Sequence, residues 1–144
     1  MTTWVLVADS ARARFLQTES PARELKEMQV LVNPSARLKE QDLVADAPGS
    51  HGDGAMPGRH RMPQRQDAKS KARKTFAKEI DHQLNTAFGQ GQFDKLCLVA
   101  APNFLGELRS GLSKEVRQRI SGELSRDITT LNVTDIYAAL KPFL

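Results

Sequence analysis

The feature that most constrains the fold is the stretch 94–112, DKLCLVAAPNFLGELRSGL, where a short apolar run passes directly into a helical pattern. Residues 96–101 are continuously apolar and too few for a core helix, so they predict a strand that is buried on both faces. Pro102 ends the run, and Asn103 is a candidate N-cap for the helix that follows. The apolar residues of that helix recur at helical spacing: Phe104, Leu105, Leu108 and Leu112.

The turn between this strand and its helix is a candidate ligand site, because loops at the carboxyl ends of sheet strands often bind ligands. Asn103 lies at the turn, and Arg109 is predicted on the first turns of the helix, where its guanidinium could bind a phosphate. The alternatives are a plain core strand backed by a helix, and an Arg109 that pairs near Glu107 or with a loop acid such as Asp46. The sequence does not separate these interpretations.

An N-terminal antiparallel meander is predicted from three runs of strand-forming residues, at 4–8, 13–17 and 25–32. Asp9 and Ser10 suit the turn between the first two runs, because their side chains bond to nearby backbone amides. In the third run the alternating apolar face is expected to meet the core, and it consists of Leu25, Met28, Val30 and Val32.

The longest helix is predicted over 67–88, with Asp67 as its cap and the glycines of Gly89-Gln90-Gly91 at its end. Its buried stripe recurs every four residues: Ala72, Phe76, Ile80, Leu84 and Phe88.

Weaker patterns complete the chain. They predict a helical turn at 114–120, a short fifth strand at 122–126, and a terminal helix capped by Thr134 or its neighbour. The apolar face of that last helix consists of Ile136, Tyr137, Leu140 and Phe143.

Residues 33–66 show no periodicity, and 46–66 concentrate glycine and proline, which predicts a long mobile loop. His51, Asp53 and His60 lie in it, but their spacing matches no zinc-binding pattern, so no metal site is predicted. At 144 residues the chain fits one domain, 1–144. We therefore expect a single mixed α/β domain with a five-stranded mixed sheet and a long helix packed on it.

The longest apolar runs fall far short of the roughly 20 residues that a membrane-spanning helix needs. The N-terminus, MTTWVLVADS, shows no secretory signal pattern. These features predict a cytoplasmic protein that does not enter a membrane. The single cysteine, Cys97, lies within the central strand, which predicts a core residue rather than a disulfide or a catalytic thiol. No cofactor is expected.

Positive charge is concentrated in one block of the sequence. From Arg59 to Lys78 there are eight basic residues against one acid, Asp67, which gives 8 − 1 = +7, so the rest of the chain sums to 4 − 7 = −3. Such a block attracts phosphate backbones or acidic surfaces, and the alternative is a solvated helix face. The residues predicted to contact nucleic acid are Arg59, Arg61, Arg65, Lys69 and Arg73.

Short motifs, each present once, are spread along nearly the whole chain: WVLVAD at 4–9, ARAR at 11–14, NPSAR at 33–37, DL at 42–43, DAPG at 46–49, FA at 76–77, FDKL at 93–96 and AAPNFLGELR at 100–109. Together these motifs are specific, although none is so by itself. A chain that carries them resembles the bacterial host attachment family, whose members are named as required for attachment to host cells.

That family is in turn similar to the central domain of archaeal and eukaryotic peptide-chain release factors, which implies a ribonuclease H-like mixed sheet. In release factors a Gly-Gly-Gln loop precedes the long helix, and its glutamine helps water to cleave peptidyl-tRNA. The corresponding stretch here, 46–66, has no Gly-Gly-Gln, and the related 89–92 segment lies at the other end of the helix. Peptide-release catalysis is therefore not carried over, and no catalytic residue is predicted.

Three functions remain open. The resemblance and the basic block favour a non-catalytic module that binds the ribosome or tRNA. Direct adhesion would fit the family's name, but no signal, anchor or repeat supports a host-surface partner. A metal-dependent nuclease is suggested by the expected fold and by Asp9, yet the central strand ends in Ala101-Pro102-Asn103 without a carboxylate. We predict the binding module; the oligomeric state is not specified.

Overall fold

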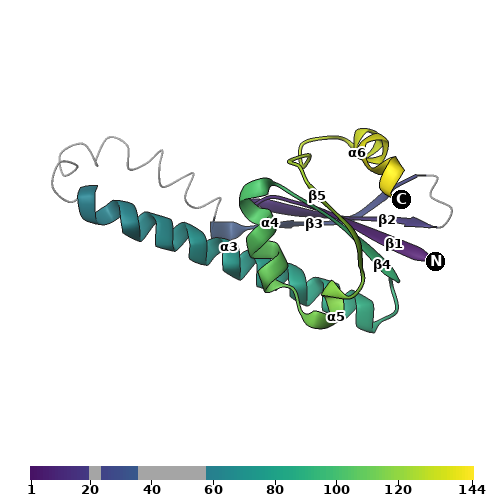
Figure 1. Cartoon of the computed structure of the whole chain (residues 1–144), viewed down its shortest axis with the longest axis horizontal. Coiled ribbons are helices and arrows are strands. Elements are labelled where there is room, and N and C mark those ends of the chain that lie inside the picture. The colour runs from purple at the N-terminus through teal and green to yellow at the C-terminus, as the bar shows by residue number, and fades with distance from the viewer. Residues whose placement is uncertain (20–23, 36–57) are drawn as a thin grey trace.

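A mixed five-stranded sheet organises residues 1–19, 24–35 and 58–144, the part of the chain that the computed structural model describes (Figure 1). The strands are β1 (Thr2–Ala8), β2 (Arg12–Glu19), β3 (Lys26–Val32), β4 (Lys95–Ala100) and β5 (Ile120–Ser125). The helices are α3 (Gly58–Gly89), α4 (Pro102–Gly111), α5 (Lys114–Arg117) and α6 (Val133–Leu140), followed by the short 3-10 helix η1 (Lys141–Phe143).

The strand order is β3-β2-β1-β4-β5. β1 pairs antiparallel with β2, and β2 pairs antiparallel with β3, so the predicted N-terminal meander is confirmed. β4 inserts parallel to both β1 and β5, with Cys97 in register with Val5. Every residue from Leu96 to Ala100 is buried, which confirms the apolar run as a central strand covered on both faces. The predicted mixed α/β class is therefore correct.

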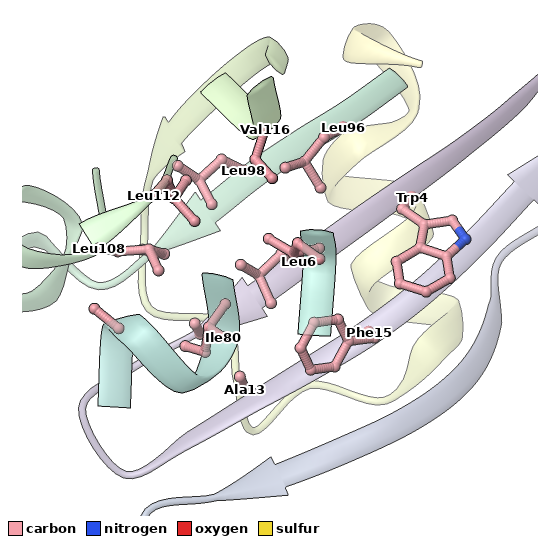
Figure 2. Close-up of a cluster of buried hydrophobic side chains, with 14 of the residues drawn as sticks. Trp4, Leu6, Ala13, Phe15, Ile80, Leu96, Leu98, Leu108, Leu112 and Val116 are labelled. Carbon is pink, nitrogen blue, oxygen red and sulfur yellow. The ribbon is translucent and has the colours of Figure 1, made fainter. Parts of the chain in front are cut away.

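The larger core lies between one face of the sheet and the three helices α3, α4 and α5 (Figure 2). Leu6 and Leu98 project from the central strands toward Ile80 of α3 and Leu108 of α4. Aromatic rings extend this core at both ends: the centroids of Trp4 and Phe93 lie 5.1 Å apart, and those of Phe76 and Phe104 lie 5.9 Å apart. Large apolar side chains packed in this way supply most of the stabilisation of a small domain.

The crossing of α3 and α4 is close because it has a glycine at the contact. A Cβ placed on Gly111 would lie 2.8 Å from the Cβ of Ala77, and the Ala77 side chain is fully buried. Two small residues facing each other let the helix backbones approach, which brings Leu108 and Ile80 onto the same core.

A second, smaller core lies on the opposite face of the sheet under α6. Val5, Val7, Cys97 and Val99 point to this side, and Ile136 and Leu140 of α6 belong to the same cluster. Burial raises the pKa of the Cys97 thiol from 9.0 to about 11, because the thiolate is poorly solvated there. Cys97 is thus a core residue, as its place in the sequence predicts.

Helix α3 begins well before the predicted position. It starts at Gly58, so residues 58–66, predicted as loop, are helical, while 46–57 lie outside the described residues. Asp67 is inside the helix and is not its cap. Glycine and proline in the sequence suggested a loop, but the arginine, glutamine, lysine and alanine residues that surround them favour helix, and extending a helix that is already packed costs little.

The end of α3 is the glycine turn that the sequence predicts. Gly91 has a φ of 71°, the left-handed conformation that glycine adopts without strain. Its N–H donates to Phe88 O at 2.9 Å, and the N–H of Gln92 donates to Ala87 O at 2.9 Å. These two bonds form a Schellman motif, so the glycine and glutamine of this segment terminate a helix.

The predicted burial of β3 is wrong. Met28, Val30 and Val32 are 47%, 48% and 48% exposed, and of the predicted apolar face only Leu25 is buried. The side chain that packs on the larger core is Leu31, from the other face of the strand. β3 is the end strand of the sheet, and the elements of the smaller core do not reach over it.

Two helix caps also differ from prediction. The residue that caps α4 is Ala101, with Pro102 in the first turn, and Asn103 makes no capping bond. In α6 the cap is Asn132, two residues before Thr134, and its side chain accepts from the N–H of Asp135 at 2.8 Å. Phe143, expected on the apolar face of α6, lies in η1 and is 57% exposed.

Candidate nucleic-acid interface

Helix α3 is longer than the sheet that it covers. Its 32 residues span about 48 Å at 1.5 Å per residue. Figure 1 shows the N-terminal part of the helix projecting past the sheet, with the C-terminal part packed under α4 and α5. Its buried residues are found only from Phe76 onward in the part with described side chains: Phe76, Ala77, Ile80, Leu84 and Ala87.

A row of three exposed lysines follows the face of α3 that points away from the core. Lys71, Lys74 and Lys78 are separated by three and four residues, the spacing of neighbours on one helix face. At 100° per residue, this row lies opposite the buried stripe of Phe76, Ile80 and Leu84. The three ammonium groups are thus carried in a line about 10 Å long on a rigid support. We call these residues the lysine row.

The lysine row carries like charges at a spacing where such charges repel each other and destabilise a helix slightly. The ion pairs among described side chains are Arg14–Glu27 and Arg109–Glu123, and neither involves α3. Among the described side chains no carboxylate neutralises the row, so its charge can attract an anion from solution, and binding such an anion would relieve the repulsion.

The structure places the residues predicted to contact nucleic acid on α3. Arg59, Arg61 and Arg65 belong to the early part of the helix, where side chains are outside the described residues. Lys69 is exposed. Arg73 is half-buried, and its Nε is shielded from solvent without a hydrogen-bond partner among the described groups, so it belongs to the inner side of the helix.

Sequence reasoning counted Lys71, Lys74 and Lys78 in the basic block but did not single them out. A signal was present, because the predicted stripe at Phe76, Ile80 and Leu84 already implies which residues lie on the opposite face. Applying helical spacing to the lysines as well as to the apolar residues would have found the row.

The predicted ligand turn at Asn103 and Arg109 is not assembled. α4 runs from Pro102 to Gly111, so Arg109 lies in its last turn and not in its first turns. Asn103 is exposed in the first turn, about 9 Å away along the helix axis. Nothing in the described geometry brings the two side chains together.

Arg109 instead forms an exposed, two-pronged ion pair with Glu123 of β5. Its Nη2 donates to Oε2 at 2.7 Å, and its Nε donates to Oε1 at 3.2 Å. The hydrogen bond to the carboxylate raises the pKa of the guanidinium. The partner of Arg109 in this pair is therefore neither Glu107 nor Asp46. Glu123 follows Arg109 by fourteen residues in the sequence, and the pairing of β5 with β4 brings the two side chains together.

A second polar cluster lies where β1 ends. The carboxylate of Asp9 accepts the N–H groups of Ala11 and Arg12 at 2.8 Å, which fixes the turn to β2. The hydroxyl oxygen of buried Thr129 lies 2.9 Å from both Asp9 Oδ2 and Asp127 Oδ1, so the hydroxyl can donate a hydrogen bond to either carboxylate. Asp9 is thus engaged in holding the turn and the segment after β5.

The described residues contain no group of three or more His, Cys, Asp or Glu side chains that could hold a metal ion. Among the same residues, no helix combines the length and the apolar character needed to cross a membrane.

A single mixed α/β domain with a projecting basic helix is the class of protein that these observations define. The chain matches the family described as "Protein required for attachment to host cells" over residues 4–140. It therefore belongs to this host-attachment family, as the motifs in its sequence predict.

No curated protein matches the chain significantly. Among solved structures, the chain is similar to an archaeal translation termination factor, aRF1, with 11% identity and a TM-score of 0.46. The match covers 99% of this chain and 39% of the termination factor, so the chain spans well under half the length of that structure. No function follows from a likeness at this level.

Proposed function

We propose that this protein is a non-catalytic RNA-binding module of the cytoplasm that associates with tRNA or the ribosome through the outer face of α3. The observation that carries the proposal is the lysine row: Lys71, Lys74 and Lys78 are exposed, aligned and unpaired with any described carboxylate. Three such charges on one rigid helix favour a polyanion with regularly spaced phosphates over a single small anion.

The binding free energy of such a row comes from releasing the cations condensed on the nucleic acid. Each phosphate contact to a single strand contributes a slope of about −0.7 in log K against log salt. Three contacts therefore give a slope of 3 × 0.7, about 2. At 0.1 M salt the affinity is then about 2 log units, or about a hundredfold, higher than at about 1 M salt. This contribution is independent of base sequence, so the protein is expected to recognise RNA by its backbone.

The projecting part of α3 supports the same function. A helix that extends beyond the sheet can reach into a crevice or lie along a groove without the body of the domain colliding with the RNA (Figure 1). Arg59, Arg61, Arg65 and Lys69 are on this part of the helix, so it carries further positive charge. Host attachment, in the family's description, would then depend on the protein indirectly, through an effect on translation.

The test is a fluorescence polarisation titration of labelled tRNA with a triple variant, Lys71→Gln, Lys74→Gln and Lys78→Gln. Glutamine keeps the length and helix propensity of lysine and removes only its charge. The matched control changes three exposed lysines elsewhere, Lys95, Lys114 and Lys141, to glutamine, so both variants lose three positive charges.

The α3 variant is expected to bind about a hundredfold more weakly at 0.1 M salt, and the control to remain within about threefold of the unchanged protein. Equal losses in both variants would mean that net charge alone attracts RNA. Absence of binding by the unchanged protein at low salt would refute the proposal. Co-sedimentation with ribosomal subunits, using the same two variants, then distinguishes a ribosomal partner from free tRNA.

A further inference from the structure

In the part of the chain that the structure describes, no strand pairs with the outer side of β3. β3 ends the sheet and pairs with β2 alone among the described strands. The N–H of Asn33 donates to Ala11 O at 2.8 Å, which continues the antiparallel register of Val32 with Arg12. Residues in an antiparallel pair alternate between those that bond to the partner strand and those that point away. Val30 and Val32 therefore direct their N–H and C=O groups away from β2.

The same residues carry exposed apolar side chains. Val30 and Val32 stand opposite Arg14 and Arg12, on the sheet face that α6 covers only over the central strands. Met28 lies beside them at the register shift, so β3 carries an apolar row of three large side chains, each about half exposed. An edge strand that combines free backbone groups with an apolar row is a template for pairing with another strand.

We propose that β3 pairs antiparallel with β3 of a second copy of this chain, about a two-fold axis that passes through Val30. In this register Val30 lies opposite the partner's Val30, and Met28 lies opposite the partner's Val32. The two sheets join into one continuous sheet, and each apolar side chain of the row meets an apolar side chain across the new strand pair.

The sequence of β3 favours a second copy over an unrelated strand, because β3 paired antiparallel with itself sets apolar residues opposite apolar residues. In the register about Val30, Glu27 faces the partner's Asn33, so no like charges are opposed. Moving the axis to Gln29 places Val32 against Lys26, and moving it to Leu31 places Met28 against Pro34. In the register about Val30, Lys26 lies opposite Pro34. The register about Val30 is the one of these three in which each of Met28, Val30 and Val32 lies opposite another apolar residue of the three.

The dimer formed in this way is weak. A single strand pair gives an interface smaller than that of a stable complex. The register between β2 and β3 also shifts beside Met28, since Phe15 pairs with Gln29 and Leu16 pairs with Glu27. Such a bulge disturbs the edge at that end, which leaves Val30 and Val32 as the centre of the contact.

Sedimentation equilibrium of the full chain, from about 10 μM to about 1 mM and without RNA, tests the proposal. The unchanged protein is expected to pass from monomer to dimer over this range. Val30→Lys opposes two like charges at the axis and is expected to weaken dimerisation at least about tenfold. The control Phe143→Lys changes another exposed apolar residue in the same way and is expected to keep the dimer.

Disulfide trapping tests the register. Directly opposed residues of an antiparallel pair lie within the Cα separation of a disulfide, so Val30→Cys is expected to give a covalent dimer under mild oxidation. Val32→Cys faces the partner's Met28 and is expected to give none, and the native Cys97 is buried. A protein that is monomeric at every concentration, a dimer that survives Val30→Lys, or equal trapping at both positions would overturn the proposal. RNA binding does not enter either measurement, so this proposal stands or falls separately from the function of α3.

Discussion

Replacing Gly111 by alanine tests whether the close crossing of α3 and α4 sets the position of these helices. The added Cβ would lie 2.8 Å from the Cβ of Ala77, a distance that side-chain carbons do not tolerate, and 3.4 Å from the Ala77 carbonyl carbon. Ala77 is fully buried, so the helix itself must shift. Overpacking of this kind costs about 1–3 kcal/mol, against which alanine gains at most about 1 kcal/mol in helix propensity.

The expected net effect of Gly111→Ala is a loss of about 1–2 kcal/mol in the free energy of unfolding, measured by urea denaturation. Gly106 supplies a control on the same helix, because nothing lies within 4 Å of a Cβ placed there. Gly106→Ala is expected to stabilise the protein by about 0.5–1 kcal/mol.

A double variant isolates the contact. Ala77→Gly should cost about 1 kcal/mol by itself, but together with Gly111→Ala it removes the clash. The double variant is therefore expected to be more stable than the sum of the two single losses by about 1–3 kcal/mol. If Gly111→Ala stabilises the protein as Gly106→Ala does, the helix crossing does not depend on the glycine and the reasoning is wrong.

Three further changes probe single interactions. Thr129→Val keeps the shape of a buried side chain but removes the hydroxyl that serves Asp9, and it is expected to cost about 1–3 kcal/mol in urea denaturation. The folded-state pKa of Cys97 lies above its unfolded value of 9.0, so its contribution to stability is complete below pH 9 and is lost as the pH rises through about 11. The unchanged protein should therefore lose more stability than Cys97→Ala between these pH values, and equal losses would contradict a buried thiol. Arg109→Gln breaks an exposed pair with Glu123 and is expected to leave the urea midpoint unchanged, so a clear decrease would show that this pair is structural.

The elements that could be predicted from the sequence are those whose pattern is local. The run from Leu96 to Ala100 is apolar at every position because β4 is covered on both faces, and Pro102 marks its end. The glycine turn after α3 was equally clear, since Gly91 must adopt a positive φ.

The face of β3 could not be predicted, because alternation shows which residues share a face but not which face meets the core. Met28, Val30 and Val32 alternate as a buried strand does, yet β3 is at the end of the sheet, where the smaller core does not extend. The partner of Arg109 was missed for a similar reason: Glu123 comes close only through the parallel pairing of β4 with β5. Both depend on tertiary arrangement and not on local sequence.

The residues predicted to contact nucleic acid and the lysine row lie on the same helix but are different residues. The basic block led to α3, but the residues chosen there included Arg73, which is half-buried, and omitted Lys71, Lys74 and Lys78. The position of a charge on the helix relative to the buried stripe decides whether it can meet a ligand, and charge counting alone ignores it.

The salt dependence of RNA binding tests the role of the lysine row directly, because its slope counts the phosphates that the protein contacts. The slope of log K against log salt for single-stranded RNA is expected to be shallower by about 2 in the triple variant Lys71→Gln, Lys74→Gln, Lys78→Gln, at about 0.7 per contact, and unchanged in the control at Lys95, Lys114 and Lys141. Identical slopes for all three proteins would contradict the assignment of the lysine row as the RNA-binding face.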